Sequence, residues 1–229
     1  EQSDISGIFR MVTDAFRFAE IQVNSGVDFV PVGWRVKLRV NHELLLDKEY
    51  QVRYEGYARN TKRNLKKAYA SDLRSGPSPS PETLVGLFRE NFGEKEGKLK
   101  GVHYERMTNL IKCLLDRGMA ITDGIYNPAG ILQAAACLVQ HERRHYFLFA
   151  ASSEKARENG AMFMLIDRYI QAHAGSGGLL DFEGGNDPAL GRFYRGFGAI
   201  PVNYSALSYN ALPKPVQWIF SLRRKLTVR

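Results

Sequence analysis

The stretch LDFEGGNDPALGRFYRGFGA, residues 180–199, carries the most information in this chain. An apolar, strand-like run ends in Asp181 and Glu183, and two glycines follow it. An amphipathic segment then carries Tyr194 up to Gly198, and a glycine is typical of the end of a helix. The stretch therefore predicts a strand, a turn and a helix that bring carboxylates and a phenol close together.

On both sides of this stretch, apolar residues repeat with helical or strand-like spacing along most of the chain. Helices are expected at 5–17, 54–70, 82–92, 103–116, 161–174 and 187–196, and strands at 16–24, 34–46, 119–126, 131–140, 144–152, 178–183 and 199–209. Three consecutive strands followed by helix, strand, helix and strand predict a mixed α/β sheet. We expect a cleft between strands 144–152 and 178–183.

Composition limits the class of protein. With 229 residues, 44% of them hydrophobic, the chain can bury one good core. No run reaches the ~20 apolar residues of a membrane span. Cys113 and Cys137 lie in apolar runs, which predicts two reduced core thiols and a cytoplasmic location. A net charge of +8 favours nucleic acid, a phosphorylated cofactor or an anionic membrane face as partner, with simple solubility as the alternative.

Part of that charge gathers on one predicted helix face. The cations follow the spacing i, i+3, i+4, i+7, i+8 and are Arg59, Lys62, Arg63, Lys66 and Lys67. Because like charges on one face repel, this basic stripe indicates an anion-binding surface, and a solvated face is the alternative. The opposite face carries Tyr57, Thr61, Leu65 and Ala68.

The run His141-Glu142-Arg143-Arg144-His145 has the spelling of the H-E-x-x-H metalloprotease motif. That motif holds zinc only on a helix, which places both histidines on one face. The segment that follows, YFLFAA, has strand character, so two strands joined by a polar turn are expected and no metal site. A helix over the preceding LQAAACLVQ is the alternative.

An anion site is predicted where SSEKARENG precedes the helix at 161–174. Free amide groups and the helix dipole favour a pyrophosphate at such a helix start. Gly160 permits a close backbone approach, and Lys155 or Arg157 adds positive charge.

At this point the chain resembles the GNAT acetyltransferases, whose phosphate loop follows the pattern Gln/Arg-x-x-Gly-x-Gly/Ala. Here that loop reads Arg157-Glu158-Asn159-Gly160-Ala161-Met162, with Met162 in place of the last small residue. The family's pattern Asn-x-x-Ala-x-x-x-x-Tyr-x-x-x-Gly is matched by Asn186, Ala189, Tyr194 and Gly198.

A second resemblance covers the front of the chain. YARNTKRNLKKAYA is similar to the Arg-x-x-x-Arg-Asn-x-x-Lys-Ala helix of the Fem peptidoglycan aminoacyltransferases, which carry two GNAT-like domains in tandem. DFEGGNDPALGRFYRGFGA is similar to a segment of their bacterial GNAT relatives. Together the resemblances cover about residues 50–210. They imply a GNAT-like acyltransferase domain at 49–229, and residues 1–48 as the remnant or tail of a first GNAT-like domain.

The resemblance implies transfer of an acyl group, acetyl first of all, from coenzyme A to an amine. Tyr194 would protonate the leaving thiolate, and Glu183 would accept the amine proton. Unpaired backbone N–H groups near Ala150 to Ser152 would receive the oxyanion. The cofactor residues implied are Ala151, Ser152, Lys155, Arg157, Gly160, Ala161 and Asn186. Alternatively, Tyr194 is a core residue and Glu183 caps the helix near Pro188.

Two other classes of function remain open. A Fem-like enzyme would use an aminoacyl-tRNA as donor, with the basic stripe on RNA or on an anionic cell-wall lipid precursor. A non-catalytic GNAT-like protein would bind a partner through the same stripe. The C-terminal run PVQWIFSLRRKLTVR is expected as a helix packed on the sheet, or as an interfacial helix at the inner membrane face.

Overall fold

The computed structural model describes residues 2–27, 29–93 and 99–219. Its contacts divide the chain into two units: Glu1–Val40 with Val202–Arg229, and Asn41–Pro201. The chain passes from one unit to the other within β2 (Arg35–Leu46) and at the start of β8 (Ile200–Asn210). The origin of residues 1–48 in a first GNAT-like domain stays a prediction.

The sheet of the larger unit is mixed, as predicted. Its strands are β3 (Arg74–Ser75), β4 (Ala120–Tyr126), β5 (Leu132–His141), β6 (Arg144–Ser152) and β7 (Gly178–Asp181), with the end of β2 beside β7. β4, β5 and β6 form the expected antiparallel meander, while β6 and β7 run parallel. A parallel pair requires a crossover, and the helix between these two strands provides it.

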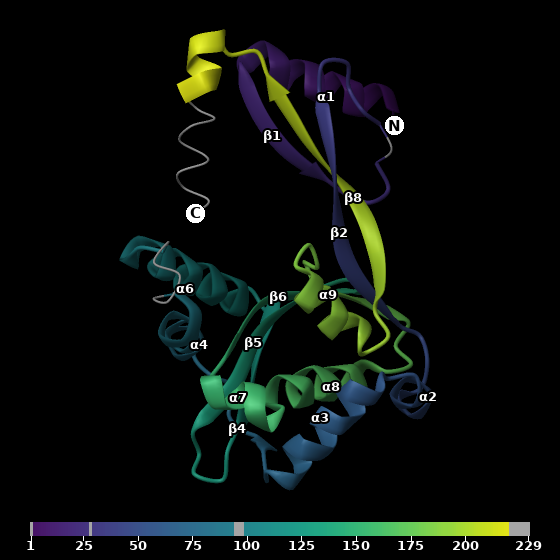
Figure 1. Ribbon diagram of the computed structural model, residues 1–229, viewed down its shortest axis with the longest axis vertical. Coiled ribbons are helices and arrows are strands. Elements are labelled where there is room, and N and C mark those ends of the chain that lie inside the picture. The colour runs from purple at the N-terminus through teal and green to yellow at the C-terminus, as the bar shows by residue number, and fades with distance from the viewer. Residues whose placement is uncertain (1, 28, 94–98, 220–229) are drawn as a thin grey trace. The chain divides into compact units, whose positions relative to one another are not determined.

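Helices cover both faces of this sheet because side chains alternate along its strands (Figure 1). Ala134, Ala136 and Leu138 of β5 belong to the core under α3 (Arg59–Ala70) and α8 (Ala161–His173). Ala135 and Cys137 belong to the opposite core under α4 (Pro81–Phe88) and α6 (Gly101–Asp116). Strand β5 is therefore apolar on both sides, which explains its continuous apolar run.

Two expected elements have different boundaries. The helix expected at 54–70 is divided into α2 (Tyr50–Glu55) and α3, because Tyr57 turns into the core and the Ala58 N–H donates to Gly196 O at 2.9 Å. The helix expected at 82–92 is α4, and it continues as the π-helical turn η1 (Arg89–Gly93).

The loop expected before residue 161 is a short helix, α7 (Glu154–Asn159). Ser153 caps it by accepting a hydrogen bond from the Ala156 N–H at 3.2 Å. Gly160, with a φ of 80°, ends α7 and leads directly into α8.

The expected pair of core thiols is wrong for one cysteine. Cys137 is buried, and burial raises its pKa to about 11. Cys113 is exposed, because it lies two residues beyond the buried Ile111 and therefore on the other side of α6. Both thiols are free.

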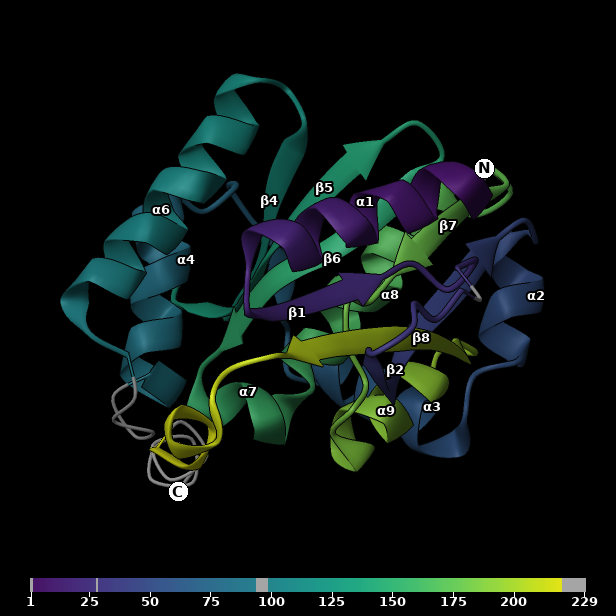
Figure 2. The ribbon, with the colours of Figure 1, turned by 90° about the horizontal axis from the view of Figure 1, so that it is seen from above.

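The smaller unit has a core of its own. Helix α1 (Gln2–Ala15) lies along β1 (Phe18–Val23), which pairs with β8 in antiparallel register (Figure 2). The buried residues of this core are Phe9, Trp34 and Leu207. Residues 214–219 are helical, and the Trp218 side chain is 67% exposed, so the burial of Trp218 expected for a helix packed on the sheet is not observed. Residues 220–229 lie outside the described part.

Within the described ranges, no helix combines the length and the apolar character that crossing a membrane requires. A position at the inner membrane face stays a prediction.

Candidate active site

A pocket opens where β6 and β7 separate, as the sequence predicted. The two strands pair from Arg144 with Leu179 to Tyr146 with Asp181, after which β6 continues alone on this side. The pocket has a volume of about 420 Å³. Its lining comes from α4, η1, β6, α8, the end of β7 and α9 (Pro188–Arg195), and consists of Phe88, Phe92, Phe147, Leu148, Phe149, Ala150, Ala151, Ser152, Met162, Phe182, Glu183, Gly184, Leu190, Phe193 and Tyr194.

Strand β6 presents backbone donors on the pocket side. A β-bulge makes Leu148 an extra residue in β6, because Cys137 pairs with Phe149 while Leu138 pairs with Phe147. Beyond the bulge, the Ser153 N–H donates to Gln133 O at 2.8 Å, toward β5. Since successive N–H groups of a strand point in opposite directions, those of Ala150 and Ser152 point away from β5. These two amides are the candidate oxyanion donors.

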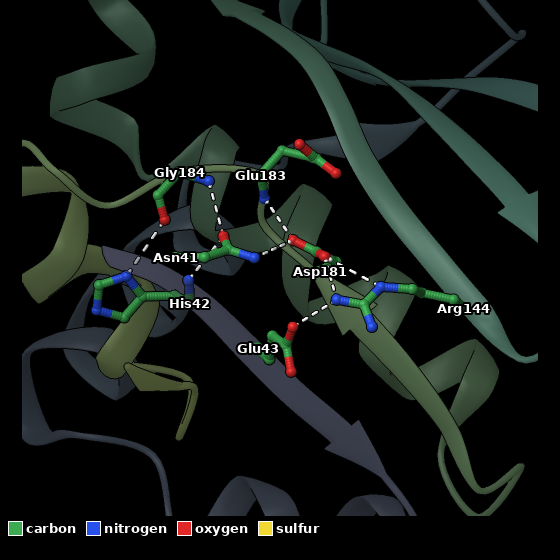
Figure 3. A network of polar contacts seen from close by, with 7 residues as sticks. All are labelled: Asn41, His42, Glu43, Arg144, Asp181, Glu183 and Gly184. Carbon is green, nitrogen blue, oxygen red and sulfur yellow. Dashed lines mark hydrogen bonds and ion pairs between the residues drawn. The ribbon is translucent and has the colours of Figure 1, made fainter. Parts of the chain in front are cut away.

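Asp181 is the centre of a polar network at the end of β7 (Figure 3). Its Oδ2 accepts from Arg144 Nε at 3.1 Å and Nη2 at 2.6 Å. Its Oδ1 accepts from Asn41 Nδ2 at 2.7 Å and from the Glu183 N–H at 2.8 Å. Arg144 also pairs with Glu43 on β2. With four hydrogen bonds and little exposure, Asp181 is the structural member of the two acids.

Glu183 has the opposite character. Its φ of 52° is left-handed, and the network fixes the backbone on both sides, since the Gly184 N–H donates to Asn41 Oδ1 at 2.9 Å. The Glu183 side chain points away from the network and lines the pocket (Figure 3). Burial and the charge of Asp181 raise its pKa, against the opposing effect of Arg144. A carboxylate with a raised pKa is a stronger base.

Glu183 does not cap the following helix. Asp187 does so, because its Oδ1 accepts from the Ala189 N–H at 2.6 Å and from the Leu190 N–H at 3.2 Å. The alternative interpretation of Glu183 as a helix cap is therefore wrong.

Tyr194 is both a packed residue and a pocket residue. It is 7% exposed, and its ring stacks on Phe182 with the ring centres 4.3 Å apart. It also lines the pocket with Glu183. Burial raises the pKa of Tyr194 to about 12, so the phenol keeps its proton at neutral pH. A protonated phenol in the pocket is a candidate general acid.

His42 was not among the residues predicted for the site; it is 1% exposed and lies beneath the turn at Gly184 and Gly185. The Gly184 carbonyl is 3.2 Å from His42 Nδ1, and because a carbonyl only accepts, Nδ1 carries the proton. The other ring nitrogen then accepts from Arg195 Nη1 at 3.3 Å. A Cβ on Gly185, which has a φ of 141°, would collide with the imidazole. The signal available in the sequence was His42 itself, because the alternation of charged and apolar residues in Arg35–Val40 predicts an apolar residue at that position.

The predicted cofactor residues fall into two groups. Ala151 and Ser152 line the pocket, whereas Lys155, Arg157, Gly160, Ala161 and Asn186 lie outside its lining. Arg157 is exposed on α7, with its guanidinium carbon 5.1 Å from the centre of the Phe92 ring. The Ala161 N–H, the first donor of α8, is bonded to Asn159 Oδ1 at 3.0 Å. A Cβ on Gly160 would collide with the backbone of Asn64, so packing against α3 also requires this glycine.

The basic stripe lies on the outer face of α3, as predicted, with Thr61, Leu65 and Ala68 buried on the inner face. Lys62 Nζ donates to Glu55 O at 2.8 Å. Arg63 Nη2 donates to Asn60 Oδ1 at 2.7 Å. Lys62 Nζ also lies over the Tyr54 ring, 5.6 Å from its centre. Arg59, Arg63, Lys66 and Lys67 are exposed, and Lys62 is partly exposed.

The H-E-x-x-H spelling lies in the turn between β5 and β6, so the predicted hairpin is confirmed and the helical alternative is wrong. Glu142 is at the turn with a φ of 53°, and Arg144 donates hydrogen bonds to Asp181. His145 is buried, and its Nδ1 is 2.7 Å from the Tyr169 hydroxyl. In the ranges that the structure describes, no three His, Cys, Asp or Glu side chains gather as metal ligands.

No protein-family model and no curated protein sequence matches the chain. Solved structures do. FemX is similar at a TM-score of 0.56 and 15% identity over 93% of this chain and 70% of that one. A protein of unknown function from Bacteroides thetaiotaomicron is similar at a TM-score of 0.54 and 10% identity, over 89% of this chain and 67% of that one. L-PGS from Bacillus licheniformis is similar at a TM-score of 0.52 and 12% identity, over 83% of this chain and 66% of that one. The chain therefore shares the fold of FemX, which confirms the predicted mixed α/β fold of the Fem kind.

Proposed function

We propose that this chain is an N-acyltransferase that moves an acyl group from acyl-coenzyme A to an amine. One observation carries the proposal: Glu183, Tyr194 and the free edge of β6 line the same pocket. Acyl transfer needs a base for the amine, donors for the oxyanion and an acid for the leaving group. The three features supply these roles within one concave site, on a fold that GNAT-type transferases share.

In the proposed reaction, the amine nitrogen attacks the thioester carbonyl carbon, and the Ala150 and Ser152 N–H groups hold the oxyanion. A C–N bond forms and the C–S bond breaks. Glu183 takes the amine proton, directly or through water, and Tyr194 gives its proton to the departing thiolate. The raised pKa of Glu183 favours the first transfer. Return of one proton from Glu183 to Tyr194, directly or through solvent, restores both groups.

Donor binding is tested by thermal denaturation with acetyl-coenzyme A and longer acyl-coenzyme A thioesters at millimolar concentration. We expect the melting temperature to rise, and Arg157→Ala to weaken binding by ~1–3 kcal/mol if the guanidinium contacts the pyrophosphate. No shift with any thioester would contradict coenzyme A as the donor.

The exposed basic stripe of α3 supports a second candidate, transfer from an aminoacyl-tRNA to a cell-wall precursor. Cations on one outer helix face are suited to phosphates of RNA or of an anionic lipid precursor. Under this candidate, turnover requires charged tRNA and binding weakens steeply with salt. A donor screen that compares acyl-coenzyme A thioesters with charged tRNA separates the two. Absence of turnover with both would favour a non-catalytic binding protein.

A further inference from the structure

The walls of the pocket are almost entirely apolar. Six phenylalanines line it, together with leucine and methionine side chains from β6, α8 and α9. Among the described lining residues, polar side chains come from Ser152, Glu183 and Tyr194. Glu183 and Tyr194, the two side chains that the proposed chemistry uses, therefore lie in a hydrophobic chamber.

The aromatic walls are held in place by their neighbours. Phe88 stacks on Phe92 with ring centres 6.0 Å apart, and it meets the edge of Phe149 at 5.0 Å. Both Phe88 and Phe149 pack against the core beneath α4 and α6. Across the pocket, Phe193 meets Phe163 at 4.8 Å. Because these rings are fixed by packing, the chamber exists before a ligand enters.

The chamber is large for an acetyl group. A cavity of ~150 Å³ lined by aliphatic and aromatic side chains holds one benzene, with six carbons. The pocket of about 420 Å³ therefore has room for on the order of ten carbons beside the reacting group. With the thioester and its arm along β6, an acetyl group would leave the Phe88 and Phe92 side of this apolar wall in contact with water, which is unfavourable.

We infer that the substrate places a bulky apolar group, an aromatic ring or an alkyl chain of roughly ten carbons, in this chamber. The inference rests on the proposed function for its location beside the reacting carbonyl. The group belongs either to the acyl chain of the donor or to the amine acceptor, and its chemistry is the same in both cases.

Turnover assays with two arms distinguish these sources. One arm compares decanoyl- and phenylacetyl-coenzyme A with acetyl-coenzyme A, using ethylamine as acceptor. The other compares decylamine and phenethylamine with ethylamine, using acetyl-coenzyme A as donor. We expect kcat/KM to be at least tenfold higher for the bulky substrate in one arm. A preference for the small substrate in both arms would overturn the inference.

A substitution that narrows the chamber localises the effect. Leu190 lines the pocket from α9 and is 47% exposed, so Leu190→Trp fills space with little burden on folding. It should reduce the preference for the bulky substrate at least tenfold. Leu110→Trp is the matched control, because Leu110 is 53% exposed on α6 and outside the pocket lining. An equal change in both variants would contradict the assignment to this pocket.

Direct binding keeps the inference separate from the proposed function. Calorimetric titration with decanoate and 4-phenylbutyrate, each against acetate, requires no turnover. Tight binding of the apolar acids that Leu190→Trp weakens tenfold, without turnover in any assay, would refute the transferase and leave the apolar site in place. Decanoate and 4-phenylbutyrate binding no better than acetate would overturn the inference, whatever the enzyme activity.

Discussion

Arg144 on β6 forms an ion pair with Asp181 at the end of β7, with two hydrogen bonds to one carboxylate oxygen, from Nε at 3.1 Å and Nη2 at 2.6 Å. The contact lies where the two parallel strands stop pairing, and Arg144 also reaches Glu43 on β2. These contacts therefore connect three strands, β2, β6 and β7. Glu183 follows Asp181 by two residues, so the same ion pair helps to fix the position of the candidate base.

Removing the charge of Asp181 should loosen this arrangement. Asp181→Asn keeps the shape of the side chain but replaces one acceptor oxygen by an NH2 donor. That donor then faces either the donors of Arg144 or the donors of Asn41 and the Glu183 N–H. We expect a loss of about 1–3 kcal/mol in the free energy of unfolding, measured by urea denaturation, and a fall in turnover. Glu105→Gln on the exposed side of α6 is the control, with no change expected. An Asp181→Asn variant as stable and active as the parent would contradict the structural role.

Glu183→Gln tests the candidate base. The amide cannot accept a proton, so turnover should fall ~100-fold while the melting temperature changes little. Because the pKa of Glu183 is raised, the carboxylate is lost as the pH falls through a value above the ordinary ~4.3 of glutamate. The acid limb of kcat/KM should have its midpoint there, and the limb should disappear in the variant. Retention of the limb in Glu183→Gln would assign it to another group.

The contribution of Asp167, on α8, to the stability of the fold should decrease as the pH rises. Its carboxyl is fully buried and accepts hydrogen bonds from the Tyr50 hydroxyl at 3.0 and 3.1 Å, and burial raises its pKa. The folded state therefore favours the neutral acid. Its stabilising contribution is complete below the unfolded pKa of ~3.9 and is lost as the pH rises through the folded pKa.

Asp167→Asn cannot ionise, so its stability relative to the parent should rise with pH over that window and then level off. Urea denaturation of both proteins at matched pH values measures this difference. Asp116→Asn, at an exposed position of α6, should show no such trend. A difference between Asp167→Asn and the parent that falls with increasing pH would contradict the raised pKa.

The parts of the site that local patterns encode were predictable. The strand character of YFLFAA predicted β6 with its observed limits, and the spacing of Thr61, Leu65 and Ala68 predicted the inner face of α3. The pairing of Glu183 with Tyr194 in one pocket followed from their closeness in sequence and from the family resemblance.

What the sequence did not reveal depends on contacts between distant segments. Asn41 and Asp181 are separated by 140 residues, and no periodicity connects them. His42 could be assigned to the glycine turn only once β2 was placed beside β7. Helix α7 was missed although its cap, Ser153, is a local signal, because five polar residues around the single Ala156 form no apolar stripe and are typical of a loop.

The basic stripe distinguishes the two donor classes. Arg63→Ala with Lys67→Ala removes two exposed charges from α3. With an aminoacyl-tRNA donor, affinity should fall and the slope of log K against log salt should decrease by roughly 0.7–0.9 per lost phosphate contact. Arg106→Ala with Arg117→Ala removes the same charge from α6 and its C-cap as a control. Equal effects of the two pairs would indicate net charge alone and contradict a specific RNA surface.

The most direct test of the account is Tyr194→Phe, measured by steady-state turnover and by donor affinity with whichever donor the screen selects. The substitution keeps the ring that stacks on Phe182 and removes the phenolic proton. Tyr69→Phe, on the exposed side of α3, is the control for loss of a hydroxyl. If Tyr194 protonates the leaving group, turnover falls ~100-fold or more while donor affinity and melting temperature stay close to those of the parent. Full turnover in a folded Tyr194→Phe variant would contradict the account, and so would a parent protein that turns over neither acyl-coenzyme A nor charged tRNA.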